Sequence, residues 1–90
     1  MVYYYLIENS ETRLIYEYYP ENQKDKQAGI ITIDKMNERI ELTEPAEEDF
    51  EKYAEELNER WWCYYDHAKR SIINDYKNGV IREVGMAAWY

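Results

Sequence analysis

Hydrophobic and polar residues alternate along the first part of the chain, and this alternation predicts a β-hairpin. Residues 2–8 and 13–19 are rich in tyrosine and other β-forming residues, and the polar residues 9–12 between them suit a four-residue loop. Side chains alternate between the two faces of a strand. The second segment is therefore divided between two faces, with Leu14, Tyr16 and Tyr18 on one and Arg13, Ile15, Glu17 and Tyr19 on the other.

A second hairpin is predicted after a polar segment. Residues 20–27 contain no apolar residue except the proline and are expected to form a surface loop. Residues 29–34 and 39–43 are again β-prone, with 35–38 as the turn and Asn37 as its left-handed residue. Pairing of the two strands is expected to bury four aliphatic residues, with Ile31 and Ile33 opposite Ile40 and Leu42.

A long helix is predicted over residues 45–77. Thr43 or Glu44 is expected to cap it, Pro45 suits its first turn, and Asn78-Gly79 follows its expected end. No glycine or further proline interrupts this range. Apolar residues recur there at three- and four-residue spacing and form one stripe, made of Phe50, Tyr53, Ala54, Leu57, Trp61, Tyr64, Tyr65, Ala68 and Ile72.

The end of the chain predicts one more strand and completes the fold. Residues 80–90 are β-prone, and Gly85 is expected to mark a bulge. The element order is then β-β-β-β-α-β, and the fold class is α+β, an antiparallel sheet of about five strands covered on one face by the long amphipathic helix. Ninety residues suffice for one core, so residues 1–90 are assigned to a single domain.

The predicted helix is longer than its domain. It would extend about 50 Å, whereas a domain of this size is about 30 Å across, so the helix is expected to break near residues 66–71 or to overhang. The row Trp62, Asp66, Lys69 and Ile73 lies outside the apolar stripe. Trp62 and Ile73 are therefore candidate anchors for a homodimer. The alternative is that Trp62 packs under the polar loop or against the last strand.

Negative charge is concentrated in one part of the chain. The net charge is −8, and residues 41–59 hold nine acids against one base, Lys52. Four glutamates spaced by four residues would form a ridge on the predicted helix and bind a basic protein partner, namely Glu47, Glu51, Glu55 and Glu59. The alternative is a solvated face whose first carboxylates favour the helix dipole. Small acidic inhibitors of restriction or CRISPR systems are similar in size and charge, so nucleic-acid mimicry is a second hypothesis.

The charge pattern also limits the classes of partner. Lysines and arginines are scattered and matched by acids, so direct binding to nucleic acid is not expected, and an anionic membrane would repel the chain. The tyrosines of the first hairpin lack the cationic groove of a base-stacking platform and favour protein partners. The sequence shows no basic leader and no long apolar run, so a cytoplasmic location is expected.

Residues suited to catalysis are scarce. The single cysteine, Cys63, and the single histidine, His67, are four residues apart and would be neighbours on the predicted helix, as nucleophile and base. No oxyanion element or glycine-containing loop accompanies them, so we interpret them as ordinary helix residues. No cofactor or metal ion is expected. The sequence favours a non-catalytic protein-interaction or regulatory module, with a small-ligand binder or an enzyme as a third hypothesis.

Overall fold

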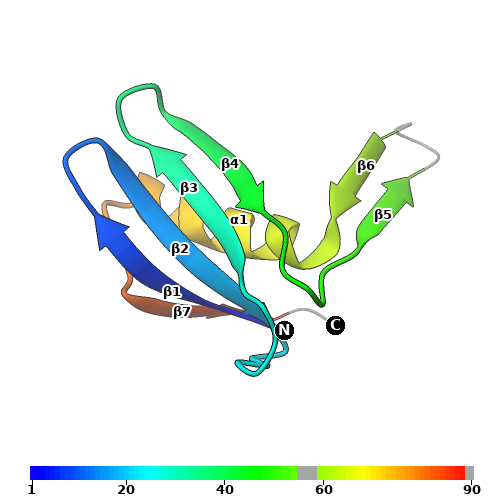
Figure 1. Cartoon of the computed structure of the whole chain (residues 1–90). Coiled ribbons are helices and arrows are strands. Elements are labelled where there is room, and N and C mark those ends of the chain that lie inside the picture. Colours follow the sequence, from blue (N-terminus) through cyan, green and yellow to red (C-terminus); the bar gives the residue numbers. More distant parts are fainter. Residues whose placement is uncertain (55–58, 89–90) are drawn as a thin grey trace.

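The described residues form a five-stranded antiparallel sheet, one α-helix and a separate two-stranded sheet (Figure 1). The computed structural model describes the backbone of residues 1–54 and 59–88 and the side chains of residues 1–50 and 62–88. In chain order the elements are β1 (Val2–Asn9), β2 (Arg13–Pro20), β3 (Gly29–Asp34), β4 (Arg39–Glu44), β5 (Glu51–Ala54), β6 (Glu59–Trp62), α1 (Cys63–Lys77) and β7 (Val84–Ala87). The strand order in the large sheet is β4-β3-β2-β1-β7.

The two predicted N-terminal hairpins are confirmed. β1 pairs with β2, and β3 pairs with β4 in the expected register, with Ile31 opposite Leu42 and Ile33 opposite Ile40. The turn between β3 and β4 differs in one residue, because Glu38 and not Asn37 has a positive φ, of 52°. The side-chain amide of Asn37 instead donates a 2.8 Å hydrogen bond to the carboxylate of Asp34, at the start of the turn.

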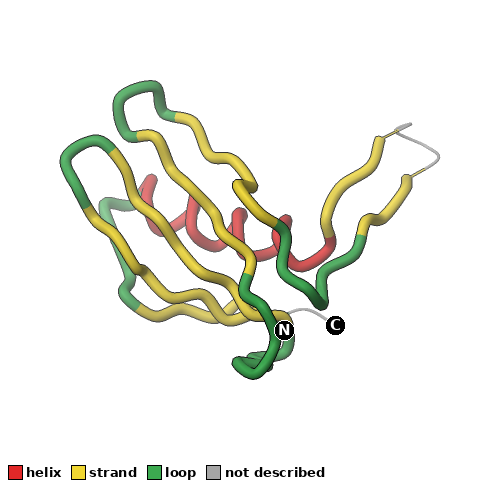
Figure 2. Tube along the Cα trace, in the orientation of Figure 1, coloured by secondary structure: helices red, strands yellow, loops and turns green. Residues whose placement is uncertain are grey.

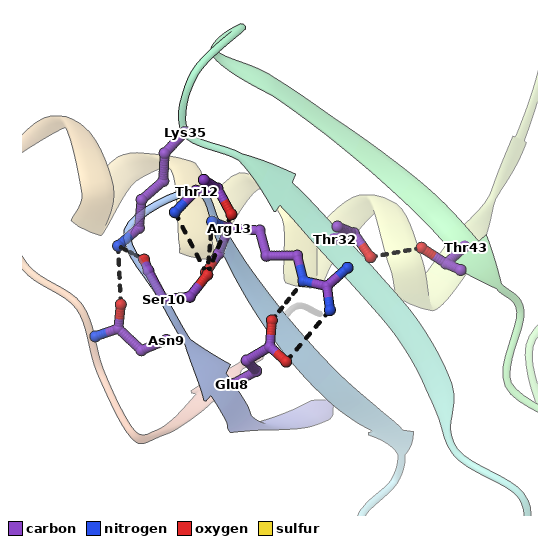
Figure 3. Close-up of polar contacts among 8 residues, drawn as sticks. All are labelled: Glu8, Asn9, Ser10, Thr12, Arg13, Thr32, Lys35 and Thr43. Atoms are coloured by element: carbon purple, nitrogen blue, oxygen red, sulfur yellow. Dashed lines mark hydrogen bonds and ion pairs between the residues drawn. The ribbon is translucent and has the colours of Figure 1, made fainter.

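Polar contacts join the two hairpin turns at one end of the sheet (Figure 3). The Ser10 hydroxyl accepts hydrogen bonds from the backbone N–H groups of Thr12 and Arg13, at 3.4 and 3.1 Å. Lys35 in the second turn donates to Asn9 Oδ1 and to the carbonyl oxygen of Ser10, at 2.8 and 2.7 Å. These bonds satisfy backbone groups that the strands leave unpaired and hold the two turns side by side.

The core lies between α1 and one face of the sheet. Ala68 and Ile72 of α1 are buried against residues that alternate along the first three strands, namely Val2, Tyr4, Leu14, Tyr16, Tyr18, Ile31 and Ile33. Burying one Val, Leu or Ile side chain contributes about 1.5–3 kcal/mol. The predicted division of residues 13–19 is confirmed, because Leu14, Tyr16 and Tyr18 are buried and the residues between them are not.

Two glycines let core tyrosines lie flat across neighbouring strands. Tyr18 is paired with Gly29, and Tyr4 is paired with Gly85. A Cβ at either glycine would overlap the ring of its tyrosine partner. The β1–β7 ladder runs without a register shift through Gly85, so the predicted bulge at this residue is wrong, and its small size serves close packing instead.

The predicted helix over 45–77 is wrong in its first half. The observed helix has 15 residues, Cys63–Lys77, and is about 22 Å long, so no excess length remains to break or overhang. The preceding range enters a loop and then β5 and β6, which project away from the large sheet (Figures 1 and 2). Glutamates spaced by four would repel one another on a helix, and the aromatic residues Tyr53, Trp61 and Trp62 favour strands.

The predicted end of the helix is confirmed. Asn78 is the C-cap, and Gly79 follows with a φ of 75°, the left-handed conformation that glycine adopts at low cost. The last strand is shorter than predicted, because residues 80–83 connect α1 to β7 without strand structure. Among the described helical residues, none forms a helix that is long and apolar enough to cross a membrane.

Candidate protein-interaction surface

The face of the large sheet opposite α1 is uncovered by any described element (Figure 1). Strand register brings five large side chains together there, which we call the tyrosine patch, made of Tyr3, Tyr5, Tyr19, Val84 and Met86. Tyr3 is paired with Met86 on one side and with Tyr19 on the other, and Tyr5 is paired with Val84. The patch therefore extends continuously over β7, β1 and β2.

The aliphatic members of the patch are the most exposed. Val84 is 58% exposed and Met86 is 48% exposed, while the three tyrosines are partly buried. Single exposed apolar side chains are common on protein surfaces, but a contiguous group of large apolar residues on one sheet face is typical of an interaction site.

Internal contacts fix two of the three tyrosines of the patch, Tyr5 and Tyr19. The rings of Tyr5 and Tyr19 pack edge to face with their centroids 5.7 Å apart. The Tyr5 hydroxyl donates a 2.9 Å hydrogen bond to Asn22 Oδ1, and the ammonium of Lys24 lies 4.4 Å from the Tyr5 ring centroid. The Tyr19 hydroxyl donates a 2.9 Å hydrogen bond to Glu17, which raises the pKa of Tyr19. Tyr5 and Tyr19 are therefore held in one arrangement before any partner binds.

Polar side chains also lie on the uncovered face, outside the tyrosine patch. Figure 3 shows the ion pair of Arg13 with Glu8 and the 2.7 Å hydrogen bond between the hydroxyls of Thr32 and Thr43, on strands in front of α1. The hydrogen bond from Arg13 is the first cause of the lowered pKa of Glu8. The uncovered face thus carries the tyrosine patch together with polar pairs on the same and on neighbouring strands, and Glu17 lies opposite Tyr5 beside the patch.

The four glutamates predicted to form a ridge do not lie on a helix. Glu47 is in the connection between β4 and β5, and Glu51 and Glu59 belong to β5 and β6, where they are opposite Trp62 and Ala54. Glu55 lies outside the described residues. The spacing by four residues therefore creates no helical ridge, because Glu51 and Glu59 lie on two antiparallel strands and Glu47 lies in a loop.

Acidic residues before β5 are engaged with the polar loop at residues 21–28. Gln27 and Glu47 exchange two hydrogen bonds, since the Gln27 N–H donates to the Glu47 carboxylate and the Glu47 N–H donates to the Gln27 carbonyl, each at 3.0 Å. The Gln27 side chain donates to Glu44 at 2.8 Å, and Lys26 pairs with Glu48 at 3.8 Å. These carboxylates anchor the loop and still contribute to the negative field of the chain.

Trp62 and Ile73 are placed differently from the predicted exposed row. Trp62 is the last residue of β6 and the N-cap of α1, and it is partly buried. Ile73 is also partly buried and lies in a groove beside Ile33 and Ile40. Self-association through Trp62 and Ile73 stays a prediction, and the burial of both side chains reduces the surface that they offer.

Asp49 joins the sheet, the helix and the acidic connection. Its carboxylate accepts hydrogen bonds from the backbone N–H groups of Tyr64 and Tyr65 at 2.9 and 3.0 Å, and Trp62 provides no side-chain cap. It also accepts a 2.8 Å hydrogen bond from the hydroxyl of Tyr18, which in turn accepts one from the Ala46 N–H. Asp49 therefore caps the N-terminus of α1 from a distant loop.

The residues considered for catalysis lie within α1. Cys63 is buried at its first position, and His67 is partly buried one turn later. Among the described residues, no group of three or more His, Cys, Asp and Glu residues is arranged to hold a metal ion. Burial raises the pKa of Tyr4, and it raises the pKa of Tyr16 to about 12, which fits structural roles in the core.

Comparisons with protein-family models, curated proteins and solved structures found no match to this chain. The site is therefore defined by the geometry alone. Tyr3, Tyr5 and Tyr19 are visible in the sequence as part of a tyrosine-rich hairpin, whereas the contribution of Val84 and Met86 was missed. The alternation of these two residues around Gly85 was the available indication, but it does not show which strand lies beside them.

Proposed function

We propose that this chain is a non-catalytic protein-interaction module that binds a partner protein through the tyrosine patch. The observation that carries the proposal is the tyrosine patch on the uncovered face of the sheet, with Val84 and Met86 58% and 48% exposed beside three tyrosines. Tyrosine and methionine are enriched in protein interfaces, and tyrosine often supplies a large part of the binding energy. The partner would cover the patch in place of water.

The fixed arrangement of Tyr5 and Tyr19 within the patch supports this role. Binding costs free energy when loose side chains must be immobilised at the interface. Ring packing between Tyr5 and Tyr19 and the hydrogen bonds to Asn22 and Glu17 have already restricted these side chains. The neighbouring polar groups Glu8, Arg13, Thr32 and Thr43 would form one side of a hydrated rim around the apolar centre.

The net charge supports a basic partner. The chain carries a net charge of −8, with the excess of acids in residues 41–59. Glu44, Glu47 and Glu48 are exposed in β4 and the connection that follows it. A concentrated negative field increases the association rate of a basic protein and weakens with added salt. Under this proposal the tyrosine patch supplies affinity, and the acidic segment that includes Glu47, Glu51, Glu55 and Glu59 supplies steering.

Site-specific photo-crosslinking tests the proposal with two matched positions. A photoreactive phenylalanine derivative replaces Met86 in the patch or Met36 in the β3–β4 turn, which is 73% exposed and lies outside the patch. Both variants are irradiated in an extract of the source cells, and the adducts are identified by mass spectrometry. We expect a discrete adduct with a basic protein from position 86 and none from position 36. Equal adducts from both positions, or none from either, would overturn the proposal.

A further inference from the structure

A second surface feature lies on the opposite side of the molecule from the tyrosine patch. A groove of about 440 Å³ runs between the C-terminal part of α1 and the β3–β4 hairpin. Its apolar walls are Ile33, Ile40, Ile73 and Tyr76, and its polar groups are Glu38, Arg39 and Lys77. Ligand sites typically have a volume of about 300–1,000 Å³, apolar walls and a few polar groups that fix orientation.

The groove is a local exception to the negative charge of the protein. Arg39 and Lys77 are both exposed, and within the described part of the chain neither is paired with a carboxylate within 4.0 Å. Glu38 is the acid among the lining residues, so the lining carries one net positive charge in a chain of net charge −8. Two cations that form no direct ion pair and lie beside apolar walls are complementary to an amphipathic anion.

Other negative groups near the groove already accept hydrogen bonds from within the protein. Asp34, which is paired with Arg39 across the ladder, accepts three hydrogen bonds from Met36 and Asn37 of its own turn. Hydrogen bonds from Asn37 are the first causes of the lowered pKa of Asp34, and the charge of Arg39 is the smallest. The last carbonyls of α1 also have partners, because backbone N–H groups of residues 78–80 donate to Asp75 and Tyr76. Lys77 further offsets the negative end of the helix dipole.

We propose that this groove binds a small amphipathic carboxylate, such as a medium-chain fatty acid. The hydrocarbon part would lie between Ile40 and Ile73, and the carboxylate would face Arg39 and Lys77. Burial of the chain supplies most of the affinity, and the two cations select an acid over an alcohol or amine of equal length. This site is separate from the tyrosine patch, so either proposal can fail without the other.

Binding of three eight-carbon probes tests the proposal. Octanoate, octanol and octylamine are titrated, below the onset of micelle formation, into protein labelled at the isoleucine methyl groups. We expect octanoate to bind most tightly and to shift the NMR signals of Ile40 and Ile73. Absence of these shifts, or binding of octanol or octylamine at least as tight as that of octanoate, would overturn the proposal.

Charge variants provide the second measurement. The double variant Arg39→Gln and Lys77→Gln is expected to weaken octanoate binding roughly fivefold, since exposed ion pairs are weak individually, and to leave octanol binding unchanged. The matched control is Lys24→Gln with Lys26→Gln, which makes the same change in net charge on the loop at residues 21–28. Equal octanoate affinity in the two double variants would contradict a carboxylate site at Arg39 and Lys77. Circular dichroism shows whether each variant is folded.

Discussion

Replacement of Asp49 by alanine is predicted to destabilise the fold strongly, although the residue is only partly buried in a loop. The carboxylate is the cap of α1, because it accepts hydrogen bonds from the N–H groups of Tyr64 and Tyr65 and Trp62 provides no side-chain cap. It also accepts the hydrogen bond from the Tyr18 hydroxyl, and Tyr18 is fully buried. A single substitution therefore removes a helix cap and leaves a buried donor without its acceptor.

The size of the expected destabilisation follows from the loss of the helix cap and the loss of the acceptor for Tyr18. Removal of a helix N-cap costs about 0.5–2 kcal/mol, and a buried donor left unsatisfied costs about 1–3 kcal/mol. We therefore expect Asp49→Ala to lower the free energy of unfolding by about 2–4 kcal/mol. For a domain of this size, the melting temperature would fall by roughly 10–25 °C. Urea and thermal unfolding followed by circular dichroism measure both quantities.

The neighbouring Glu48 provides the matched control. Glu48 is exposed and forms only a long ion pair with Lys26 at 3.8 Å, so Glu48→Ala should change stability by less than about 0.5 kcal/mol. A double-mutant cycle of Asp49→Ala with Tyr18→Phe should show a coupling energy of about 1 kcal/mol. If Asp49→Ala is no more destabilising than Glu48→Ala, the assignment of Asp49 as the helix cap is wrong.

The remaining predictions concern the tyrosine-rich core. Burial raises the pKa of Tyr4, Tyr16 and Tyr18 above the ordinary value of 10.0. Above pH 10 the unfolded chain loses phenol protons that the folded chain keeps. The stability that these three phenols contribute should therefore be constant well below pH 10 and fall as the pH rises toward 12, as measured by urea titrations at each pH. A urea midpoint that does not decrease between pH 10 and pH 12 would contradict this prediction. Gly29→Ala should cost about 1–3 kcal/mol, because the new methyl group overlaps the Tyr18 ring. A methyl group at Gly79 would meet open space, so Gly79→Ala should cost less, about 1 kcal/mol, because of the φ of 75°. If chemical denaturation shows that Gly79→Ala is more destabilising than Gly29→Ala, the close packing of Gly29 against Tyr18 does not determine the cost.

The sequence predicts the structure correctly where that structure depends on residues close together in the chain. Alternation in residues 13–19 assigned Leu14, Tyr16 and Tyr18 to the buried face, and Asn78 and Gly79 marked the end of the helix. The start of the helix could not be found in the same way. Its cap is Asp49, thirteen residues before Trp62 and joined to the helix only by the folded chain.

Residues 45–62 show why helical spacing was misleading. Phe50, Tyr53, Leu57 and Trp61 recur at three- and four-residue spacing, but the same range also contains aromatic residues that favour strands. Repulsion among glutamates spaced by four weighs against the helix and does not by itself indicate a functional ridge. The tyrosine patch depends on the pairing of β7 with β1, more than seventy residues apart in the sequence, which no local pattern reveals.

The most direct test of the tyrosine patch is the affinity for the partner captured at position 86. Its dissociation constant is compared for the wild type, for Val84→Ser with Met86→Ser, and for Val80→Ser with Ile81→Ser. The second pair is matched in charge and apolar loss, and its residues are 40% and 39% exposed outside the patch. We predict about tenfold weaker binding for the patch variant and no more than about a twofold change for the control. Equal affinities of the two variants would contradict binding through the tyrosine patch.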